Sequence, residues 1–371
     1  MDGKVLLLSQ RRISDLVAFC LAYEFEDALQ AVTDAERIDA TDLASLEFSR
    51  RAYKLTRLAS GSARLAAQLA PAPRGKATLT GDFELFFPIF SNAFELYSLA
   101  TIPDWRRRCR KAACFITEVW TDQLPEYLLE LLSEFDHVFT GLQHCVGDVA
   151  RITGRPCSYL PLAADVERFA PAAPDQPRPI DVCNIGRRSP ITHRALLEDA
   201  ARRHSFYYYD TVAASGPDLK QRTFRVDSAQ EHRVMLATIL KHSRYFIANR
   251  SHVNNPEFTA GRDEISARFY EGIAAGTVMI GEAPRTEQFR RQFDWPDAVI
   301  HLPFDSPDIG SILADLNGNP GRLAAIHSRN VREAALRHDW LHRIKTVFDV
   351  LNLAPTEKMQ ARAERLKQIA R

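Results

Sequence analysis

The sequence predicts an α/β protein of two Rossmann-like domains whose parallel sheets face a central cleft. Short apolar runs of strand length alternate with longer segments of helical periodicity along the chain, which is typical of βαβ units. A proline-rich stretch at residues 170–179 separates this pattern into two sets. The 371 residues also correspond to about two domains of roughly 150 residues each. Because open parallel sheets bind ligands at the carboxyl ends of their strands, the expected site lies in the cleft.

The N-terminal set is predicted to form a domain over residues 1–168. Residues 4–8 are short and apolar enough for a first strand, and residues 13–32 are predicted to form the helix after it. Further apolar runs of strand length are residues 85–89, 112–117, 137–141 and 158–161.

Residues 169–179 are predicted to be a stiff, extended linker. Four prolines fall between residues 170 and 179, and the stretch has no periodicity. The alternative is a surface loop within one domain. The linker is favoured because a new strand-loop-helix set begins immediately afterwards.

The second set is predicted to form a domain over residues 180–340. Its expected strands are residues 180–185, 205–209, 245–248, 278–280 and 299–302. Its expected helices are residues 192–203, 228–242, 265–275 and 306–316. The charged segments 338–351 and 356–370 are predicted to be helical, and residues 341–371 are expected to cross back to the N-terminal domain.

Composition excludes several other classes of protein. Hydrophobic residues make up 46% and charged residues 26%, and the net charge of +1 gives no general attraction to nucleic acid or membranes. The six cysteines are scattered, which favours reduced thiols in a cytoplasmic protein over disulfides or a zinc site. No window approaches eighteen apolar residues, so no membrane span is expected.

The most specific local pattern is the segment 261–281. It has the form of a loop that ends in two acids, a helix, a glycine and a buried strand. Asp263 suits the N-cap of the helix and Gly276 suits the left-handed position after it. Glu271 lies inside the helix among small residues, which permit the close approach of a partner.

This segment resembles the donor-binding signature of retaining glycosyltransferases with the GT-B fold, in the group 1 set close to glycosyltransferase family four. The signature is an acid, seven residues, and then a glutamate followed by a helix end rich in small residues. The resemblance implies that Glu271 binds the ribose of the donor nucleotide. It also implies that Asp263 or Glu264 contacts the transferred sugar, and it places Arg268 among the donor-binding residues.

A second pattern is a strand that ends at Gly186 and is followed by two basic residues, Arg187 and Arg188. Ser189 or Thr192 can cap the next helix, whose N-terminus offers unpaired N–H groups and a positive dipole end. The segment is similar to the family's Gly-Arg element, whose basic residues neutralise the leaving diphosphate. The family's additional lysine has His193 or Arg194 as its nearest counterpart here.

Other positions follow from the same resemblance. Residues 159–171 look like the family's crossing between domains. Arg225 would lie near the nucleobase, and Asn249 and Arg250 near the phosphates or the sugar. In the N-terminal half, Glu118 follows a predicted strand and is a candidate to orient an acceptor hydroxyl, although a cleft-edge acid without a role fits equally well. The basic cluster 105–111 is interpreted as a solvated helix face rather than as a site for an anionic acceptor.

The resemblance implies transfer of a sugar from a nucleotide diphosphate sugar, with retention at the anomeric carbon and without a metal or other cofactor. The donor is expected to be UDP- or GDP-linked, and the acceptor a glycan, a lipid-linked molecule or a small molecule. No nucleic-acid partner is expected, and a peripheral membrane contact is left open. Two alternatives stay open: a nucleotide-sugar epimerase of the same fold, and a non-catalytic relative that binds a nucleotide or glycan. The sequence has no Asp-x-Asp pair, Gly-x-Gly-x-x-Gly loop, Walker loop or Gly-x-Ser-x-Gly elbow.

Overall fold

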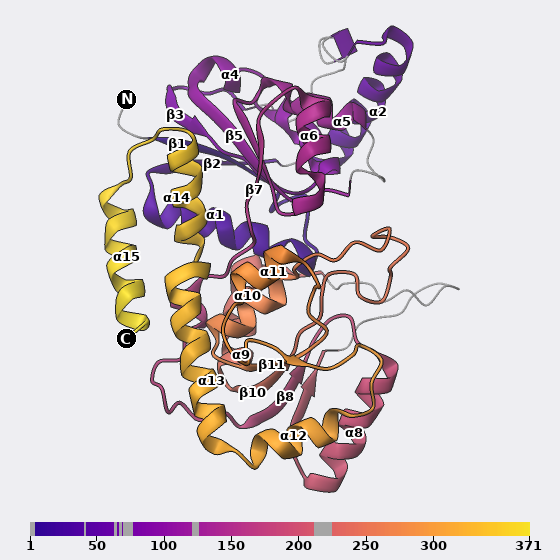
Figure 1. Cartoon of the computed structure of the whole chain (residues 1–371). Helices are drawn as coiled ribbons and strands as arrows, with labels where there is room; N and C mark the ends of the chain where they lie inside the picture. The colour runs from indigo at the N-terminus through magenta and orange to yellow at the C-terminus, as the bar shows by residue number, and fades with distance from the viewer. Residues whose placement is uncertain are drawn as a thin grey trace. The chain divides into compact units, whose positions relative to one another are not determined.

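The computed structural model describes residues 4–371 with the exception of residues 41, 63–64, 67–68, 70–76, 121–125 and 211–224. The chain divides into two compact units, each built around its own parallel sheet (Figure 1). Unit 1 comprises Met1–Asp15, Phe19–Pro161 and Arg343–Ala361. Unit 2 comprises Leu16–Ala18, Leu162–His342 and Arg362–Arg371. The predicted α/β class with two parallel sheets is confirmed.

In its described residues, unit 1 has a seven-stranded sheet in the order β2-β1-β3-β5-β6-β7, with β4 paired to β5. All of these pairings are parallel. The strands are β1 (Val5–Ser9), β2 (Ala35–Asp39), β3 (Phe83–Phe86), β4 (Ile89–Asn92), β5 (Cys109–Glu118), β6 (His137–Thr140) and β7 (Cys157–Tyr159). The helices of this part of the chain are η1 (Val17–Phe19), α1 (Cys20–Val32), α2 (Leu43–Ser60), η2 (Ala93–Thr101), α4 (Trp105–Arg108), α5 (Glu126–Leu129), η4 (Glu130–Glu134), η5 (Gln143–Cys145) and α6 (Val146–Thr153).

Three features of unit 1 differ from the sequence prediction. The helix expected from residue 13 begins at Cys20, after the short η1 turn. The run 85–89 is divided between β3 and β4, because Pro88 interrupts the ladder. The charged edge strand β2 has no apolar run and was not predicted. It forms because β1 pairs with it along its whole length, which overrides its weak strand propensity.

The basic cluster 105–111 is neutralised by acidic neighbours in unit 1. The Trp105 indole is buried and stacks with Phe135 at a centroid separation of 4.8 Å. Four arginines are each paired with a carboxylate: Arg106 with Asp136, Arg107 with Asp104, Arg108 with Asp82 and Arg110 with Glu84. This part of the surface therefore carries little unbalanced positive charge.

Unit 1 also buries a carboxyl group near the carboxyl end of β4. The Glu95 residue is 8% exposed, and its Oε2 accepts a hydrogen bond of 2.7 Å from the backbone N–H of Ser91. Its Oε1 is buried and has no hydrogen-bond partner among the described residues. Burial raises the pKa of Glu95 to about 7. The charged form of this side chain is therefore disfavoured in the folded protein.

This burial predicts a stability that depends on pH. Because the folded pKa lies above the unfolded value, the contribution of Glu95 is complete at acidic pH and is lost as the pH rises through 7. One pKa unit corresponds to about 1.4 kcal/mol, so the expected loss between pH 5 and pH 8 is roughly 3 kcal/mol. Glu95→Gln should flatten this dependence in urea unfolding curves. Equal pH slopes for the two proteins would contradict the assignment.

Unit 2 has a five-stranded parallel sheet in its described residues, in the order β12-β11-β10-β8-β9. The strands are β8 (Ile180–Asn184), β9 (Tyr207–Tyr209), β10 (Ser243–Ile247), β11 (Val278–Gly281) and β12 (Ile300–His301). The helices are α7 (Val166–Phe169), α8 (Pro190–Arg203), α9 (Ala229–Lys241), α10 (Ala267–Ala274), α11 (Glu287–Gln292), α12 (Ile309–Asn317), α13 (Pro320–Glu333) and the π-helix η6 (Ala334–His338). The apolar core under this sheet includes Val182, Tyr245, Ile247, Val278, Ile280, Leu313 and Ile326.

The chain ends in two helices, α14 (Trp340–Val350) and α15 (Glu357–Ile369). The final segment of unit 2, Arg362–Arg371, begins within α15 and is held by a buried ion cluster. Arg362 donates from Nε to Asp339 Oδ1 at 2.8 Å and from Nη2 to Asp339 Oδ2 at 2.7 Å. Its Nη2 also lies 2.7 Å from Asp165 Oδ1, and its Nη1 lies 3.3 Å from Glu167 Oε2. One buried guanidinium thus forms ion pairs with three carboxylates.

None of the helices in the described part of the chain has the length and apolar character that spanning a bilayer requires.

Candidate functional site

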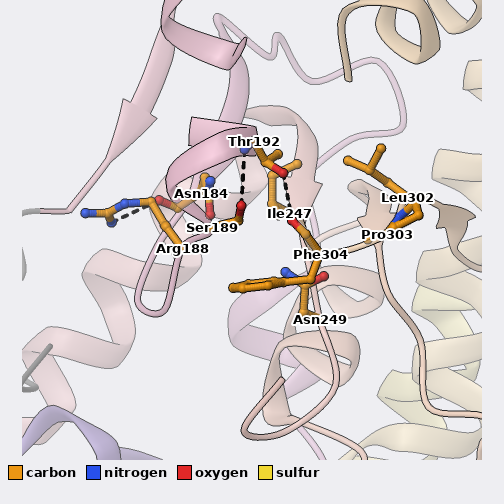
Figure 2. Close-up of a pocket in the computed structure, with 10 residues that line it drawn as sticks. Asn184, Arg188, Ser189, Thr192, Ile247, Asn249, Leu302, Pro303 and Phe304 are labelled. Atoms are coloured by element: carbon orange, nitrogen blue, oxygen red, sulfur yellow. Dashed lines mark hydrogen bonds between the residues drawn. The ribbon is translucent and has the colours of Figure 1, made fainter. Parts of the chain in front are cut away.

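The carboxyl ends of β8, β10, β11 and β12 meet at one edge of unit 2, because these strands run parallel. Figure 2 shows a pocket at this edge. Its lining residues come from the strand ends, from the start of α8 and from the loop after β12: Asn184, Arg188, Ser189, Thr192, Ile247, Asn249, Gly281, Leu302, Pro303 and Phe304.

The helix α8 begins at Pro190, two residues before its predicted start, and Ser189, one of the two predicted candidates, is its N-cap. The Ser189 hydroxyl oxygen accepts from the backbone N–H groups of Ile191 and Thr192, each at 3.2 Å. Since proline has no N–H, the first turn keeps its positive dipole end but offers fewer unpaired donors than expected. Positive charge at this edge must therefore come mainly from side chains.

Two hydroxyl groups connect the start of α8 to the loop after β12, and Figure 2 shows the one of Thr192, which bonds to Phe304. Ser189 Oγ donates to Asp305 Oδ1 at 2.6 Å, and Thr192 Oγ1 lies 2.7 Å from the carbonyl oxygen of Phe304. These bonds fix the pocket wall formed by the loop relative to the helix start.

Gly186, directly after β8, has a positive φ of 76°, which a glycine adopts without strain. A Cβ atom at this position would collide with the guanidinium group of Arg268. The backbone N–H of Gly186 donates to Asp210 Oδ1 at 2.8 Å. Glycine is therefore favoured here by the conformation of the turn, and it leaves room for the arginine.

The two predicted arginines of this turn have different surroundings. Arg188 forms an ion pair with Asp210, and its guanidinium lies 5.4 Å from the centre of the Tyr209 ring. In Figure 2 its side chain points away from Leu302, Pro303 and Phe304. Arg187 is exposed. Arg188 therefore stabilises the turn, whereas Arg187 reaches solvent.

Arg268 lies in the first turn of α10 and packs against Gly186. Within the described residues no carboxylate lies at ion-pair distance from it. Burial lowers the pKa of its guanidinium, as does the nearby Arg187, while Glu271 raises it. An arginine stays protonated at neutral pH even with a lowered pKa. A partly buried cation without an ion-pair partner is a suitable contact for an anionic ligand.

The residues after β10 and β11 form a second polar group at the same edge. Arg250 Nε donates to Glu282 Oε1 at 3.0 Å, and Arg250 Nη1 lies 3.3 Å from Asp263 Oδ1. Asp263 Oδ2 accepts from the backbone N–H of Arg285 at 3.0 Å. Asn249 Oδ1 accepts from the backbone N–H of Glu282 at 2.8 Å. The structure thus brings together Asn249, Arg250 and Asp263.

The donor-loop helix differs from its prediction at its start and agrees at its end. The expectation that Asp263 caps this helix is wrong, because α10 begins at Ala267 and Ser266 occupies the N-cap. Asp263 instead binds Arg250 and the backbone of Arg285. After the helix, Gly276 has a φ of 66°, so its predicted left-handed conformation is confirmed.

Two of the predicted acids are buried. Glu264 and Glu271 are each 5% exposed. Glu271 Oε1 accepts from Arg233 Nη1 of α9, and both partners of this ion pair are buried. The Arg233 guanidinium also lies 5.0 Å from the centre of the Phe169 ring.

Residues 187–349 match a protein-family model described as glycosyl transferase-like. These residues form a glycosyl transferase-like domain. The match covers nearly the whole of the edge described above, and it makes the chain a transferase, as predicted. No curated protein sequence matches the chain.

The chain is also similar to several solved structures. HepE from Anabaena, crystallised in complex with UDP-glucose, is 13% identical, with 94% of this chain and 99% of HepE covered and a TM-score of 0.53. The kitacinnamycin glycotransferase is 13% identical over 94% of this chain and 99% of its own, with a TM-score of 0.39. TarM is 10% identical over 72% of this chain and 54% of its own, with a TM-score of 0.43. The likeness to HepE confirms the predicted GT-B architecture.

Three further sequence candidates are Glu118, His193 and Arg194. Glu118 belongs to unit 1, where its Oε1 accepts from Trp120 Nε1 at 2.6 Å. His193 lies in α8 with its Nδ1 2.8 Å from the Tyr207 hydroxyl, and burial lowers the pKa of its imidazole. His193 is therefore a neutral hydrogen-bonding group rather than a substitute for a lysine. Arg194, the other candidate for that position, is exposed.

Sequence reasoning missed three acids of the glycosyl transferase-like domain that organise this edge: Asp210, Glu282 and Asp305. Asp210 and Glu282 each follow a strand directly. Since carboxyl ends of parallel strands gather at one edge, an acid in this position is a recognisable signal. All three acids lie outside the family pattern that the sequence resembles.

Proposed function

We propose that this transferase moves a sugar from a nucleotide diphosphate sugar to a hydroxyl-bearing acceptor. The observation that carries the proposal is Arg268, a partly buried cation that packs against Gly186 and has no ion-pair partner among the described residues. Gly186, Arg187 and Arg268 would bind the diphosphate together with the dipole of α8. The complex of HepE with UDP-glucose makes UDP-glucose the first donor to test.

The chemical step needs stabilisation of the negative charge that grows on the departing diphosphate. Fixed cations that are already in place stabilise such charge without having to reorganise. We infer that Arg187 and Arg268 supply this charge, so that the reaction needs neither a metal ion nor another cofactor, and that it retains the anomeric configuration. Arg188 acts indirectly, because its pair with Asp210 holds the turn in place. The acceptor would be a glycan, a lipid-linked molecule or a small molecule.

Glu271 is proposed to contact the ribose of the donor. Its buried ion pair with Arg233 fixes the carboxylate and leaves Oε1 occupied, so the second oxygen would accept from a ribose hydroxyl. A carboxylate held in this way is already oriented before the nucleotide binds.

Asp263 is the better of the two acids for contact with the transferred sugar. Its carboxylate belongs to the polar group at the strand ends, where it lies 3.3 Å from Arg250 Nη1. Asp263→Asn should lower kcat/KM about tenfold, because a hydrogen bond to a charged group contributes about 1.5–3 kcal/mol. Glu264→Gln should change stability more than kinetics. Steady-state kinetics and thermal melts of both variants separate the two roles, and the reverse result would assign the contact to Glu264.

The proposed function is tested by titrating the full chain with UDP, GDP and UDP-glucose in a calorimeter. Donor turnover is then measured with simple sugar acceptors, and the anomeric proton of the product is followed by NMR. Binding of a nucleotide together with α-configured product from an α-linked donor supports the proposal. Interconversion of the donor sugar without an acceptor would indicate an epimerase, and binding of a nucleotide without any turnover would indicate a non-catalytic relative.

A further inference from the structure

The helix α2 is bound to unit 1 along one face. Leu46, Ser49 and Tyr53 are buried on this face, and the Tyr53 hydroxyl donates to the carbonyl oxygen of Tyr127 at 3.0 Å. Arg57 donates two hydrogen bonds to the Glu130 carboxylate, at 2.8 and 2.6 Å. Figure 1 shows the helix. These contacts fix which side of α2 points outward.

The outward face of α2 carries three exposed apolar side chains. Phe48 is 64% exposed, Leu55 68% and Leu58 71%. Steps of seven and three residues place the three side chains on one stripe of the helix, opposite the buried Tyr53. Exposed apolar side chains that gather on one face indicate an interaction surface more strongly than single exposed residues do.

The charges beside this stripe are positive. The helix carries Arg50, Arg51, Lys54 and Arg57 against one acid, Glu47. Arg57 is neutralised by Glu130, but Arg51 and Lys54 have no carboxylate at ion-pair distance in the described part of the chain. Arg51 lies within the apolar stripe, since it is three residues from Phe48 and four from Leu55. The arginines around residues 106–110 differ, because each of the four that were described is paired with an acid.

A second exposed aromatic side chain adjoins the helix. Phe94 of η2 is 51% exposed, and the Arg50 guanidinium lies 5.7 Å from the centre of its ring. A cation over an exposed aromatic ring combines positive charge with apolar surface. Such a pair suits the boundary between the charged lipid headgroups and the apolar acyl chains.

We propose that α2 docks onto the surface of an anionic membrane, with Phe48, Leu55 and Leu58 at the acyl boundary and Arg51 and Lys54 on the lipid phosphates. The positive charge beside the apolar stripe is complementary to a negatively charged lipid surface. It therefore favours an anionic membrane over a protein partner of unspecified charge. The helix lies in the plane of the interface rather than across it, because one of its faces is packed against unit 1. The proposal does not depend on the proposed function.

The test is co-sedimentation of the full chain with vesicles of phosphatidylcholine alone and of phosphatidylcholine with 30% phosphatidylglycerol. The unaltered chain should bind the anionic vesicles at least tenfold more tightly than the neutral ones and should lose most of this preference in 0.5 M NaCl. The variant Phe48→Ser, Leu55→Ser, Leu58→Ser should reduce binding to anionic vesicles at least tenfold. The variant Arg51→Ser, Lys54→Ser should reduce the preference for anionic lipid.

A matched control removes three exposed apolar residues elsewhere: Leu197→Ser on α8 with Val234→Ser and Met235→Ser on α9, whose residues are 42%, 49% and 48% exposed. This control should bind vesicles like the unaltered chain. Thermal melts establish that all of the variants are folded. Absence of binding to either vesicle would overturn the proposal, as would equal losses in the α2 variant and the control. A dimer in light scattering that dissociates in the α2 apolar variant, without vesicle binding, would assign the face to self-association instead and would also overturn it.

Discussion

Replacing Arg268 by alanine is expected to lower kcat/KM for the donor by about tenfold to hundredfold. The side chain packs against Gly186 and has no ion-pair partner among the described residues, so its charge is available to the diphosphate. A hydrogen bond to a charged group contributes about 1.5–3 kcal/mol, and about 1.4 kcal/mol corresponds to a factor of ten. Because the leaving diphosphate gains charge during the reaction, kcat should fall more than the affinity for UDP.

Steady-state kinetics and UDP calorimetry check this prediction. Arg268→Lys should recover part of the loss, since lysine keeps the charge but lacks the planar fork of the guanidinium. Arg329→Ala is a suitable control. This arginine of α13 has a side chain that is 45% exposed, and its ion pair with Glu333 is long, at 4.0 Å. If Arg268→Ala and Arg329→Ala had equal kinetics, the diphosphate would have to bind elsewhere.

Replacing Arg362 by alanine is expected to destabilise the protein by about 3–5 kcal/mol. The guanidinium is bound by both oxygens of Asp339, a residue that is fully buried, and by Asp165. Asp339 also accepts backbone hydrogen bonds from Val166 and Leu341 and cannot move to solvent without losing them. Removing the arginine would leave a buried carboxylate without its counter-charge.

Urea unfolding at neutral pH measures this loss. Arg365, one turn further along α15, provides the comparison, because its side chain is 53% exposed and pairs with Glu167 at 2.6 Å. Arg365→Ala should cost less than about 1 kcal/mol, as exposed ion pairs do. A similar loss of unfolding free energy in both variants would show that burial of the ion cluster does not determine its contribution to stability.

The features that the sequence predicted correctly depend on neighbouring residues. Ser189 caps α8 and Gly276 has its left-handed conformation, because capping and turn geometry are decided within a few positions. The alternation of apolar runs and helical segments likewise predicted both sheets, since their buried strands are short and apolar.

The features that were missed depend on residues far apart in the chain. Asp210 binds the turn at Gly186, which is 24 positions away, and Arg233 pairs with Glu271 at a separation of 38. No local pattern specifies these partners, because they meet only after the strands have been ordered in the sheet. The edge strand β2 is a similar case, since pairing with β1 determines its conformation.

Unit 2 is assembled from separate segments of the chain, and this has a practical consequence for experiments on the isolated halves of the molecule. Its main segment ends at His342, but the arginine that neutralises Asp339 is residue 362 and arrives with the last ten residues of the chain. A fragment that stops at 342 would therefore expose an uncompensated acid and should be poorly soluble. Co-expression with a peptide that contains residues 357–371 would be the way to obtain that half by itself.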